Sequence, residues 1–276
     1  MSLKGQTFYT LCRSRTGHVV ARAAVSALRR AGIARNFHMP LDALLLDHAP
    51  VAGLMRLWSK VHWSSGDGMM PGPQLLEIYR LAATWPVKGD IVELGAWVGL
   101  TTSYLATACR VRGAGKVHAV DTFDGTKEGG TKYTSVARFG GGTLDAFRAH
   151  IVRAGVTVYI EEVIHDTTAA SRQYGGAPIR MLLIDADHSY GGVRAEFSNW
   201  FRHVAPGGLI VFHDYNMPEV ARFVDGEVRG DPRVVPSPGP VVSNVIAVTK
   251  KPRPRAHRLP ERWPPRPAAV ALAEMP

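Results

Sequence analysis

VELGAWVG, residues 92–99, is the stretch that decides the fold. Its pattern predicts the end of a buried strand, a tight turn at Gly95 and the start of a helix after Gly99. A dinucleotide-binding turn needs three closely spaced glycines, so that a pyrophosphate can approach the helix N-terminus. Trp97 and the valine after it interrupt that spacing, which argues against nicotinamide binding. The acidic Glu93 suits a ligand with an ammonium or sulfonium charge, because opposite charges attract.

Around this turn, apolar runs alternate with helical patterns from residue 90 onward. This alternation predicts a Rossmann-like, doubly wound α/β fold with a mostly parallel sheet. Before it, the cluster SSGDGMMPGP at 64–73 marks a domain boundary or a lid, and Gln74–Thr84 has helical periodicity. The runs expected to form strands are Ile91–Leu94, Val117–Val120, Val156–Ile160, Met181–Ile184, Leu209–Phe212 and Val245–Val248.

The 276 residues divide into three parts. We expect an N-terminal helical segment and lid at 1–65, one α/β domain at 66–250, and a flexible Pro/Arg-rich tail at 251–276. No apolar run approaches the roughly 18 residues that span a membrane. Two cysteines, Cys12 and Cys109, are too few for a disulfide framework, and no signal peptide is visible. We therefore expect a cytoplasmic protein.

The formal net charge of +10 lies at the two ends of the chain. Residues 1–41 hold seven Lys and Arg and no acid, and residues 250–276 hold seven against two acids. The body between them has 19 bases and 21 acids. The expected domain is therefore not a basic platform for nucleic acid.

The N-terminal segment Arg15–Ala34 is Ala-rich and predicts a helix with Arg15, Arg22 and Arg29 at seven-residue spacing. Such a helix could pack on the domain or on a partner subunit with its arginines in water. It could also make peripheral contact with an anionic membrane, and an Arg-rich start without acids is also typical of a mitochondrial transit peptide. These alternatives stay open.

Asp121 ends the second predicted strand, 26 residues after Gly95. In a doubly wound fold, a carboxylate at this point can accept hydrogen bonds from the two hydroxyls of an adenosine ribose. The alternative is that Asp121 only caps the turn that follows.

Five polar side chains follow two later strands: Asp185, Asp187 and His188 after one, His213 and Asp214 after the other. Because the carboxyl ends of parallel strands share one edge, we expect them to converge. The carboxylates suit magnesium or manganese, and an imidazole ligand favours manganese, iron or zinc. His188 is a candidate general base. The alternative is that both histidines only hydrogen-bond to neighbouring carboxylates.

The stretches 92–99, 121–125 (DTFDG), 184–190 (IDADHSY) and 206–215 (PGGLIVFHDY) resemble the class I S-adenosylmethionine-dependent methyltransferases. The first has the E-x-G-x-x-x-G form of the catechol and caffeoyl-CoA O-methyltransferases. Together the stretches are most similar to a bacterial branch with macrocin-type sugar O-methyltransferases and cephalosporin-biosynthesis methyltransferase-like proteins. The resemblance covers about 66–250. It implies a sheet of seven strands whose last strand is antiparallel.

The resemblance also implies roles for individual residues. His188, where the catechol enzymes have a lysine, and Asp187 would be catalytic. His213 stands where the family usually has an acidic residue. The implied metal ligands, for a divalent cation such as magnesium or manganese, are Asp185, His213 and Asp214. The implied S-adenosylmethionine-binding residues are Met70, Glu93, Gly95, Trp97, Thr101, Asp121, Thr122 and Asp185.

We therefore expect an O-methyltransferase that modifies a hydroxyl of a small molecule or a sugar moiety, with a catechol-like phenol as the second choice of acceptor. The insertion Thr126–Gly142 and a lid with Trp58 and Trp63 would shape the acceptor site. By resemblance we also expect a homodimer. The alternative is a non-catalytic cofactor-binding scaffold that its basic ends recruit to a membrane or nucleic acid. An α/β hydrolase is excluded because no Gly-x-Ser-x-Gly occurs.

Overall fold

The computed structural model describes residues 69–125, 127–128, 131–132, 134–236, 242 and 244–252. The predicted helix Arg15–Ala34, the tryptophans Trp58 and Trp63, and the tail beyond residue 252 lie outside these described residues. In the described ranges, none of the helices combines the length and apolar character needed to cross a membrane.

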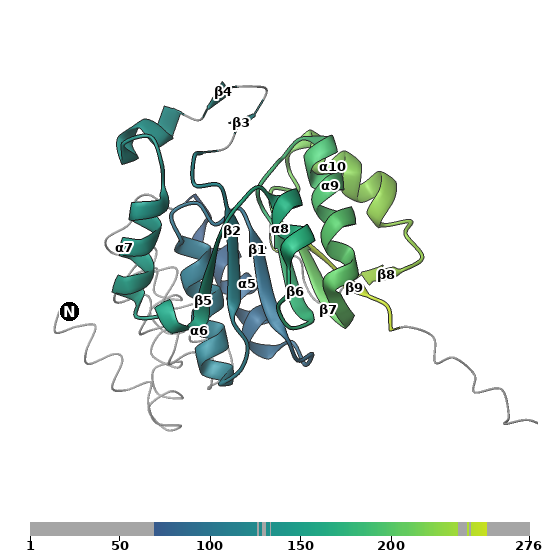
Figure 1. Cartoon of the computed structure of the whole chain (residues 1–276). Coiled ribbons are helices and arrows are strands. Elements are labelled where there is room, and N and C mark those ends of the chain that lie inside the picture. Colours follow the sequence, from purple (N-terminus) through teal and green to yellow (C-terminus); the bar gives the residue numbers. More distant parts are fainter. Residues whose placement is uncertain are drawn as a thin grey trace, which may run out of the picture.

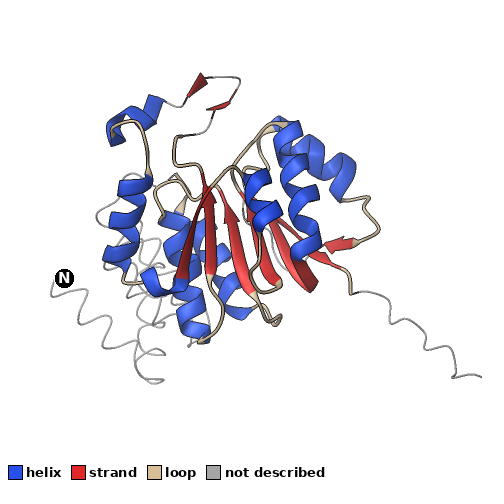
Figure 2. Ribbon diagram, viewed as in Figure 1, coloured by secondary structure: helices blue, strands red, loops and turns tan. Residues whose placement is uncertain are grey.

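A seven-stranded sheet forms the centre of the molecule (Figures 1 and 2). All neighbours from β5 to β7 pair in parallel, and β9 is antiparallel to both of its neighbours. This confirms the predicted Rossmann-like sheet whose last strand is antiparallel. Across the sheet the order is β5 (Ile160–Ile164), β2 (Val117–Asp121), β1 (Asp90–Leu94), β6 (Ile179–Ile184), β7 (Val204–Phe212), β9 (Ile246–Lys250) and β8 (Val234–Pro236).

Helices cover both faces of the sheet (Figure 1). Alternate strand residues enter two separate cores: Ile91 and Leu183 pack in one, Val92 and Ile184 in the other. The first core holds α5 (Gly72–Thr84), α6 (Leu100–Arg112) and α7 (Leu144–Ala154). The second holds α8 (Thr167–Gln173), α9 (Tyr190–Trp200) and α10 (Pro218–Phe223). Shorter elements are β3 (Lys127–Glu128), β4 (Thr131–Lys132), the 3-10 helices η1 (Thr134–Phe139), η2 (Thr157–Tyr159) and η3 (Phe201–His203), and the π-helix η4 (Val224–Val228).

The prediction of a strand at Val156–Ile160 is wrong. Val156 is buried in the first core, but η2 follows it, and strand β5 begins only at Ile160. Because β5 is an edge strand, its side chains are only partly buried or exposed. Glu162 there pairs with Arg148 of α7 at 2.8 Å. An edge strand with paired acids lacks the continuous apolar run of a central parallel strand.

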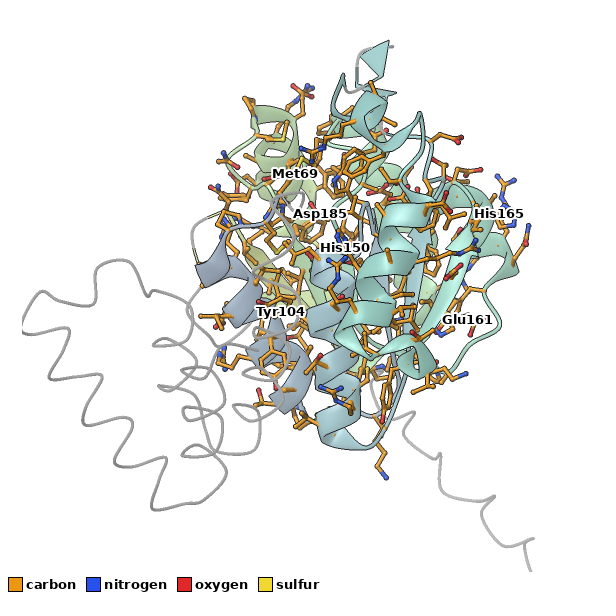
Figure 3. The ribbon with its side chains drawn as sticks, turned by 90° about the vertical axis from the view of Figure 1, so that its left-hand side faces the viewer. Met69, Tyr104, His150, Glu161, His165 and Asp185 are labelled. Atoms are coloured by element: carbon orange, nitrogen blue, oxygen red, sulfur yellow. The ribbon has the colours of Figure 1, made fainter. Side chains whose placement is uncertain are left out.

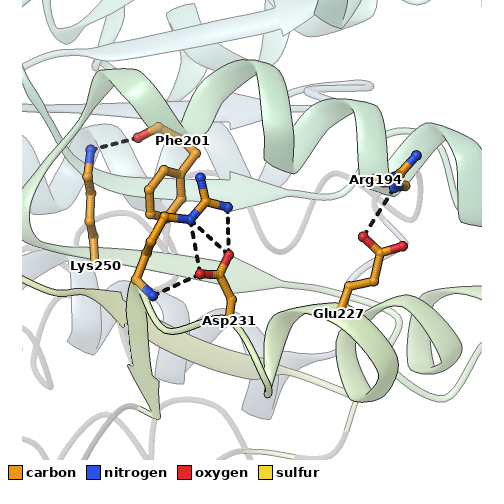
Figure 4. Close-up of polar contacts among 6 residues, drawn as sticks. Arg194, Phe201, Glu227, Asp231 and Lys250 are labelled. Carbon is orange, nitrogen blue, oxygen red and sulfur yellow. Dashed lines mark hydrogen bonds and ion pairs between the residues drawn. The ribbon is translucent and has the colours of Figure 1, made fainter.

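Polar contacts fasten the end of the sheet to the helices (Figure 4). Lys250 Nζ donates hydrogen bonds to the carbonyl oxygens of Phe201 at 2.8 Å and Val204 at 2.7 Å. Arg233 pairs with Asp231 and lies over the Phe201 ring. These contacts hold β8 and β9 against β7, whose carboxyl end contributes to the site described next.

Candidate active site

A cavity of about 350 Å³ lies at the carboxyl ends of β1, β2, β6 and β7. Met69 and Asp185, both part of its wall, are labelled in Figure 3. Most residues predicted for the site line this cavity: Met70, Gly95, Trp97, Thr101, Asp121, Asp185, His188, His213 and Asp214. Glu93, Thr122 and Asp187 are not part of the wall.

The turn after β1 approaches the end of β6 very closely. Gly95 has φ +90°, and a Cβ at this position would lie 2.2 Å from the carbonyl oxygen of Asp185. The Asp185 N–H donates a hydrogen bond to the Leu94 carbonyl at 3.0 Å. On the other side, His150 of α7 bonds through Nδ1 to the Val98 carbonyl at 2.7 Å. Only glycine fits this turn, which leaves its backbone at the cavity wall.

Glu93 is fully buried behind the turn. Its Oε2 accepts a hydrogen bond from Thr102 Oγ1 at 2.5 Å, and its Oε1 is buried without a hydrogen-bond partner among the described residues. Burial raises the pKa of Glu93 to about 8, helped by the charges of Asp185 and Asp121 and opposed by the Thr102 hydrogen bond. An unsatisfied buried oxygen is costly unless a ligand partner meets it.

Asp121 accepts two backbone hydrogen bonds at the end of β2. Oδ2 accepts from Trp97 N–H at 2.8 Å, and Oδ1 accepts from Phe123 N–H at 2.7 Å. Burial raises the pKa of Asp121, although these bonds lower it. The carboxylate therefore braces the turn that follows and also faces the cavity. Thr122, by contrast, is exposed and accepts from the Asp124 N–H at 3.3 Å.

Four of the five side chains that the sequence predicts to converge at the ends of β6 and β7 do so, and Asp187 does not. His213 Nδ1 lies 2.8 Å from Asp185 Oδ1 and 3.2 Å from Asp214 Oδ2. His188 Nε2 lies 3.1 Å from Asp214 Oδ2 and 3.8 Å from Asp185 Oδ1. Burial lowers the pKa of His213, but its two carboxylate partners outweigh burial and raise it to about 9. Burial likewise raises the pKa of Asp214, yet the two histidines hold it well below its usual value.

One set of three side chains in this cluster is arranged so that it could hold a metal ion. Ligand atoms of Asp185, His188 and Asp214 all lie within 4.8 Å of one another. His213 Nδ1 lies near the same carboxylates but makes no hydrogen bond among the described residues, whereas its Nε2 lies 2.7 Å from Gln74 Oε1 and is hydrogen-bonded to it. Two carboxylates and an imidazole are an oxygen-rich set that manganese or magnesium accepts.

The Asp187 side chain lies in a different environment from those of Asp185 and His188. Its Oδ1 accepts from the Ser189 N–H at 2.9 Å, and a Cβ on Gly192 would lie 2.0 Å from its Cγ. The carboxylate therefore packs over the first turn of α9.

Gln74, Met217 and Asn244 are among the cavity-lining residues that the sequence analysis missed. Gln74 is buried on α5 and meets His213 across 139 positions of sequence. Asn244 has φ +65°, and its carbonyl accepts from the Tyr215 N–H at 3.1 Å. The only local signal that could have pointed to Gln74 is its position directly after the Gly- and Pro-rich stretch at 64–73. The sequence around Asn244 gives no such signal.

The sheet order and the site at its carboxyl edge define a class I methyltransferase fold. A family described as a methyltransferase domain matches residues 92–215. This match confirms the resemblance to class I S-adenosylmethionine-dependent methyltransferases that the sequence motifs indicate.

Solved structures agree with the fold. The O-methyltransferase NovP is similar with a TM-score of 0.56 and 16% identity, over 69% of this chain and 84% of that chain. The O-methyltransferase TomG of Streptomyces achromogenes is involved in tomaymycin synthesis and was solved in complex with SAM. It is similar with a TM-score of 0.50 and 16% identity, over 75% of this chain and 91% of that chain. An uncharacterised protein of Acanthamoeba polyphaga mimivirus is 33% identical over 69 residues, which are 25% of this chain. The chain matches only 27% of that viral protein's length.

Proposed function

We propose that the chain is an S-adenosylmethionine-dependent O-methyltransferase, assisted by a divalent cation, that methylates a hydroxyl of a small molecule or a sugar moiety. One observation carries the proposal. A single cavity contains both the Asp121 carboxylate at the end of β2 and the cluster of Asp185, His188 and Asp214 at the ends of β6 and β7. A carboxylate suited to the hydroxyls of a ribose thus lies beside groups that can hold a cation and accept a proton.

The residues present fit S-adenosylmethionine, which supplies an electrophilic methyl group on a sulfonium when bound. The unpartnered, buried Oε1 of Glu93 suits a hydrogen bond from the cofactor's ammonium group or from a water beside it. Gly95 lets the turn pack closely against the Asp185 carbonyl, and its own backbone lies at the cavity wall, where the methionine part of the cofactor would lie. Asp121 retains lone pairs for ribose hydroxyls after accepting its two backbone bonds. Met70, Trp97 and Thr101 complete the wall.

The residues also fit a cation, with manganese or magnesium as our proposal. A bound cation lowers the pKa of a hydroxyl that it contacts. Asp185 and Asp214 would hold it, and the sequence-based choice of His213 as third ligand stays a prediction. His188 is geometrically able to ligate as well, but we assign it the role of proton acceptor, since one imidazole nitrogen cannot do both.

In the proposed reaction the acceptor oxygen gains the methyl carbon as the carbon–sulfur bond breaks, and the hydroxyl proton passes to His188. Asp214, 3.1 Å from His188 Nε2, stabilises the resulting imidazolium. The cavity wall would contribute mainly by aligning the oxygen with the methyl carbon and excluding water. Met69 and Met217 at the wall supply apolar surface for this purpose.

As the acceptor we propose a sugar hydroxyl in the first place, with a catechol-like phenol as the second choice. Support for a role of the insertion 126–142 comes from Phe139, whose ring meets that of Trp97 edge-on at 6.1 Å. In Figure 1, β3 and β4 of this insertion stand beyond the end of β2. A homodimer, a cytoplasmic location, the absence of nucleic-acid binding and a membrane contact through the basic N-terminal helix are further proposals.

The function is tested by methyl transfer from radiolabelled S-adenosylmethionine to a panel of glycosides and catechols, with manganese, with magnesium and with chelator. We expect a labelled product that requires a cation and is lost in Asp185→Asn. The matched control Asp145→Asn, on α7 and away from the cavity, should retain transfer. Equal transfer by Asp185→Asn and wild type would overturn the assignment of the cluster.

A further inference from the structure

Gln74 is a buried amide on α5 that the reaction proposed above does not use. It is 4% exposed, and its neighbours Leu75 and Ile78 pack in the first core. A buried amide costs stability unless its polar atoms find partners. Gln74 Oε1 finds one in His213 Nε2 at 2.7 Å. Because an amide oxygen can only accept a hydrogen bond, His213 carries a hydrogen on Nε2 and donates it to Gln74.

Strand β7 places the His213 ring beneath α5. Alternate residues of a strand share one face, and Leu209 and Val211 of β7 lie in the core that holds α5. His213 is the next residue in this alternation. Its backbone N–H donates a hydrogen bond to the Ile184 carbonyl at 3.1 Å, which fixes the main chain beside the end of β6. The ring therefore lies between the first turn of α5 and the carboxyl end of β6.

The helix that carries Gln74 is anchored to the same strand. Directly after α5, Trp85 Nε1 donates a hydrogen bond to the Gly207 carbonyl of β7 at 2.9 Å. In the first turn, the Gln74 N–H donates to the Pro71 carbonyl at 3.1 Å. The contacts of Trp85 and Gln74 thus tie both ends of α5 to β7. A side chain on an element held in this way can fix the orientation of the ring that it contacts.

The other nitrogen of the ring faces the carboxylates. His213 Nδ1 lies 2.8 Å from Asp185 Oδ1 and 3.2 Å from Asp214 Oδ2, and it is buried without a hydrogen-bond partner among the described residues. With the hydrogen on Nε2, a neutral ring presents its lone pair at Nδ1. Two carboxylates repel this lone pair unless a proton or a cation lies between them. Histidines that bind metal ions commonly donate their other N–H to a fixed oxygen in the same way.

We propose that Gln74 is a positioning residue: by accepting the Nε2–H of His213, it directs Nδ1 of that ring to a divalent cation held by Asp185 and Asp214. This inference deepens the proposed function and rests on the cation of that proposal. It also predicts a difference between two metals. Since an imidazole nitrogen suits manganese better than magnesium, loss of Gln74 should weaken manganese binding more than magnesium binding.

The test is calorimetric titration with manganese and, separately, with magnesium, without S-adenosylmethionine or an acceptor. Gln74→Leu removes the acceptor oxygen, Gln74→Glu keeps one, and the matched control Gln173→Leu makes the same change at the exposed end of α8. We expect Gln74→Leu to weaken manganese binding roughly 10–100-fold and magnesium binding less than about threefold. Gln74→Glu should bind manganese at least as tightly as wild type, and Gln173→Leu should match wild type.

A second comparison places Gln74→Leu in a His213→Ala background. If Gln74 acts through the imidazole, its loss should weaken manganese binding no further once the imidazole is absent. An equal loss of manganese affinity in both backgrounds would overturn the proposal, because Gln74 would then act by another route. A folded Gln74→Leu protein with wild-type manganese affinity would overturn it as well, and so would equal losses for the two metals.

If Gln74→Leu fails to fold, Gln74→Met takes its place, because it keeps the length of the side chain and lacks the amide oxygen. Titration of the wild-type protein separates this inference from the proposed function. Absence of binding of either metal by wild type would refute the cation of the proposed function and the positioning role with it. Manganese binding by wild type that survives loss of the amide would refute the positioning role alone.

Discussion

Replacing Gly95 by alanine should destabilise the protein far more than the same change at Gly113. Both glycines have positive φ, +90° and +66°, so both substitutions meet the roughly 1–2 kcal/mol cost of a left-handed conformation. A Cβ at Gly113 meets nothing within 4 Å. A Cβ at Gly95 would lie 2.2 Å from the Asp185 carbonyl oxygen, so the ends of β1 and β6 must separate by roughly 1 Å to restore van der Waals contact.

That separation strains the 3.0 Å hydrogen bond from Asp185 N–H to Leu94. Losing one hydrogen bond, about 1 kcal/mol, and overpacking a tight site, about 1–3 kcal/mol, give roughly 2–4 kcal/mol beyond the loss at Gly113. Urea unfolding measures this difference, and thermal shift with S-adenosylhomocysteine measures binding. We expect Gly95→Ala to lose ligand stabilisation and Gly113→Ala to keep it. Equal unfolding free energies and equal ligand shifts in the two variants would refute the close approach.

Three further predictions concern the site. Asp121→Asn should weaken S-adenosylhomocysteine binding roughly tenfold or more in calorimetry, because hydrogen bonds to a charged group contribute about 1.5–3 kcal/mol. The control variant Asp124→Asn, which changes an exposed carboxylate, should bind with wild-type affinity. Burial raises the pKa of Glu93 to about 8, so between about pH 5 and 8 the folded protein keeps a proton that the unfolded chain releases. Stability should therefore fall as pH rises in that window, by at most about 1.4 kcal/mol per pH unit for this group. Glu93→Gln should flatten the slope of unfolding free energy against pH, and an unchanged slope would contradict the buried acid. His188→Ala should lower kcat by about 10²–10⁴-fold with cofactor affinity unchanged; wild-type turnover would show that another group takes the proton.

The fold and most of the cavity wall could be predicted from local patterns. Central strands such as β1 and β6 are buried on both faces and mostly apolar, so each gives a largely apolar run that ends in a turn. Since parallel strands end at one edge, the polar residues after them had to meet. The cluster of Asp185, His188, His213 and Asp214 follows directly from that rule.

What the sequence could not supply depends on contacts between distant segments. The edge strand β5 starts later than predicted because its partly exposed acids break the apolar pattern. The contact between Gln74 and His213 joins residues 139 positions apart, and the contact of Glu196 with Thr167 joins residues 29 apart. Neither has a local signature. The predicted roles of Thr122 and Asp187 came from motif position, and in the structure their oxygens accept backbone hydrogen bonds outside the cavity wall.

Calorimetric titration with S-adenosylmethionine and S-adenosylhomocysteine, with and without manganese or magnesium, tests the central claim most directly. The cavity with Glu93 behind it and Asp121 at its wall predicts micromolar binding that Asp121→Ala abolishes. Absence of binding of either compound by the folded protein, under every metal condition, would contradict the cofactor assignment and the methyltransferase function with it.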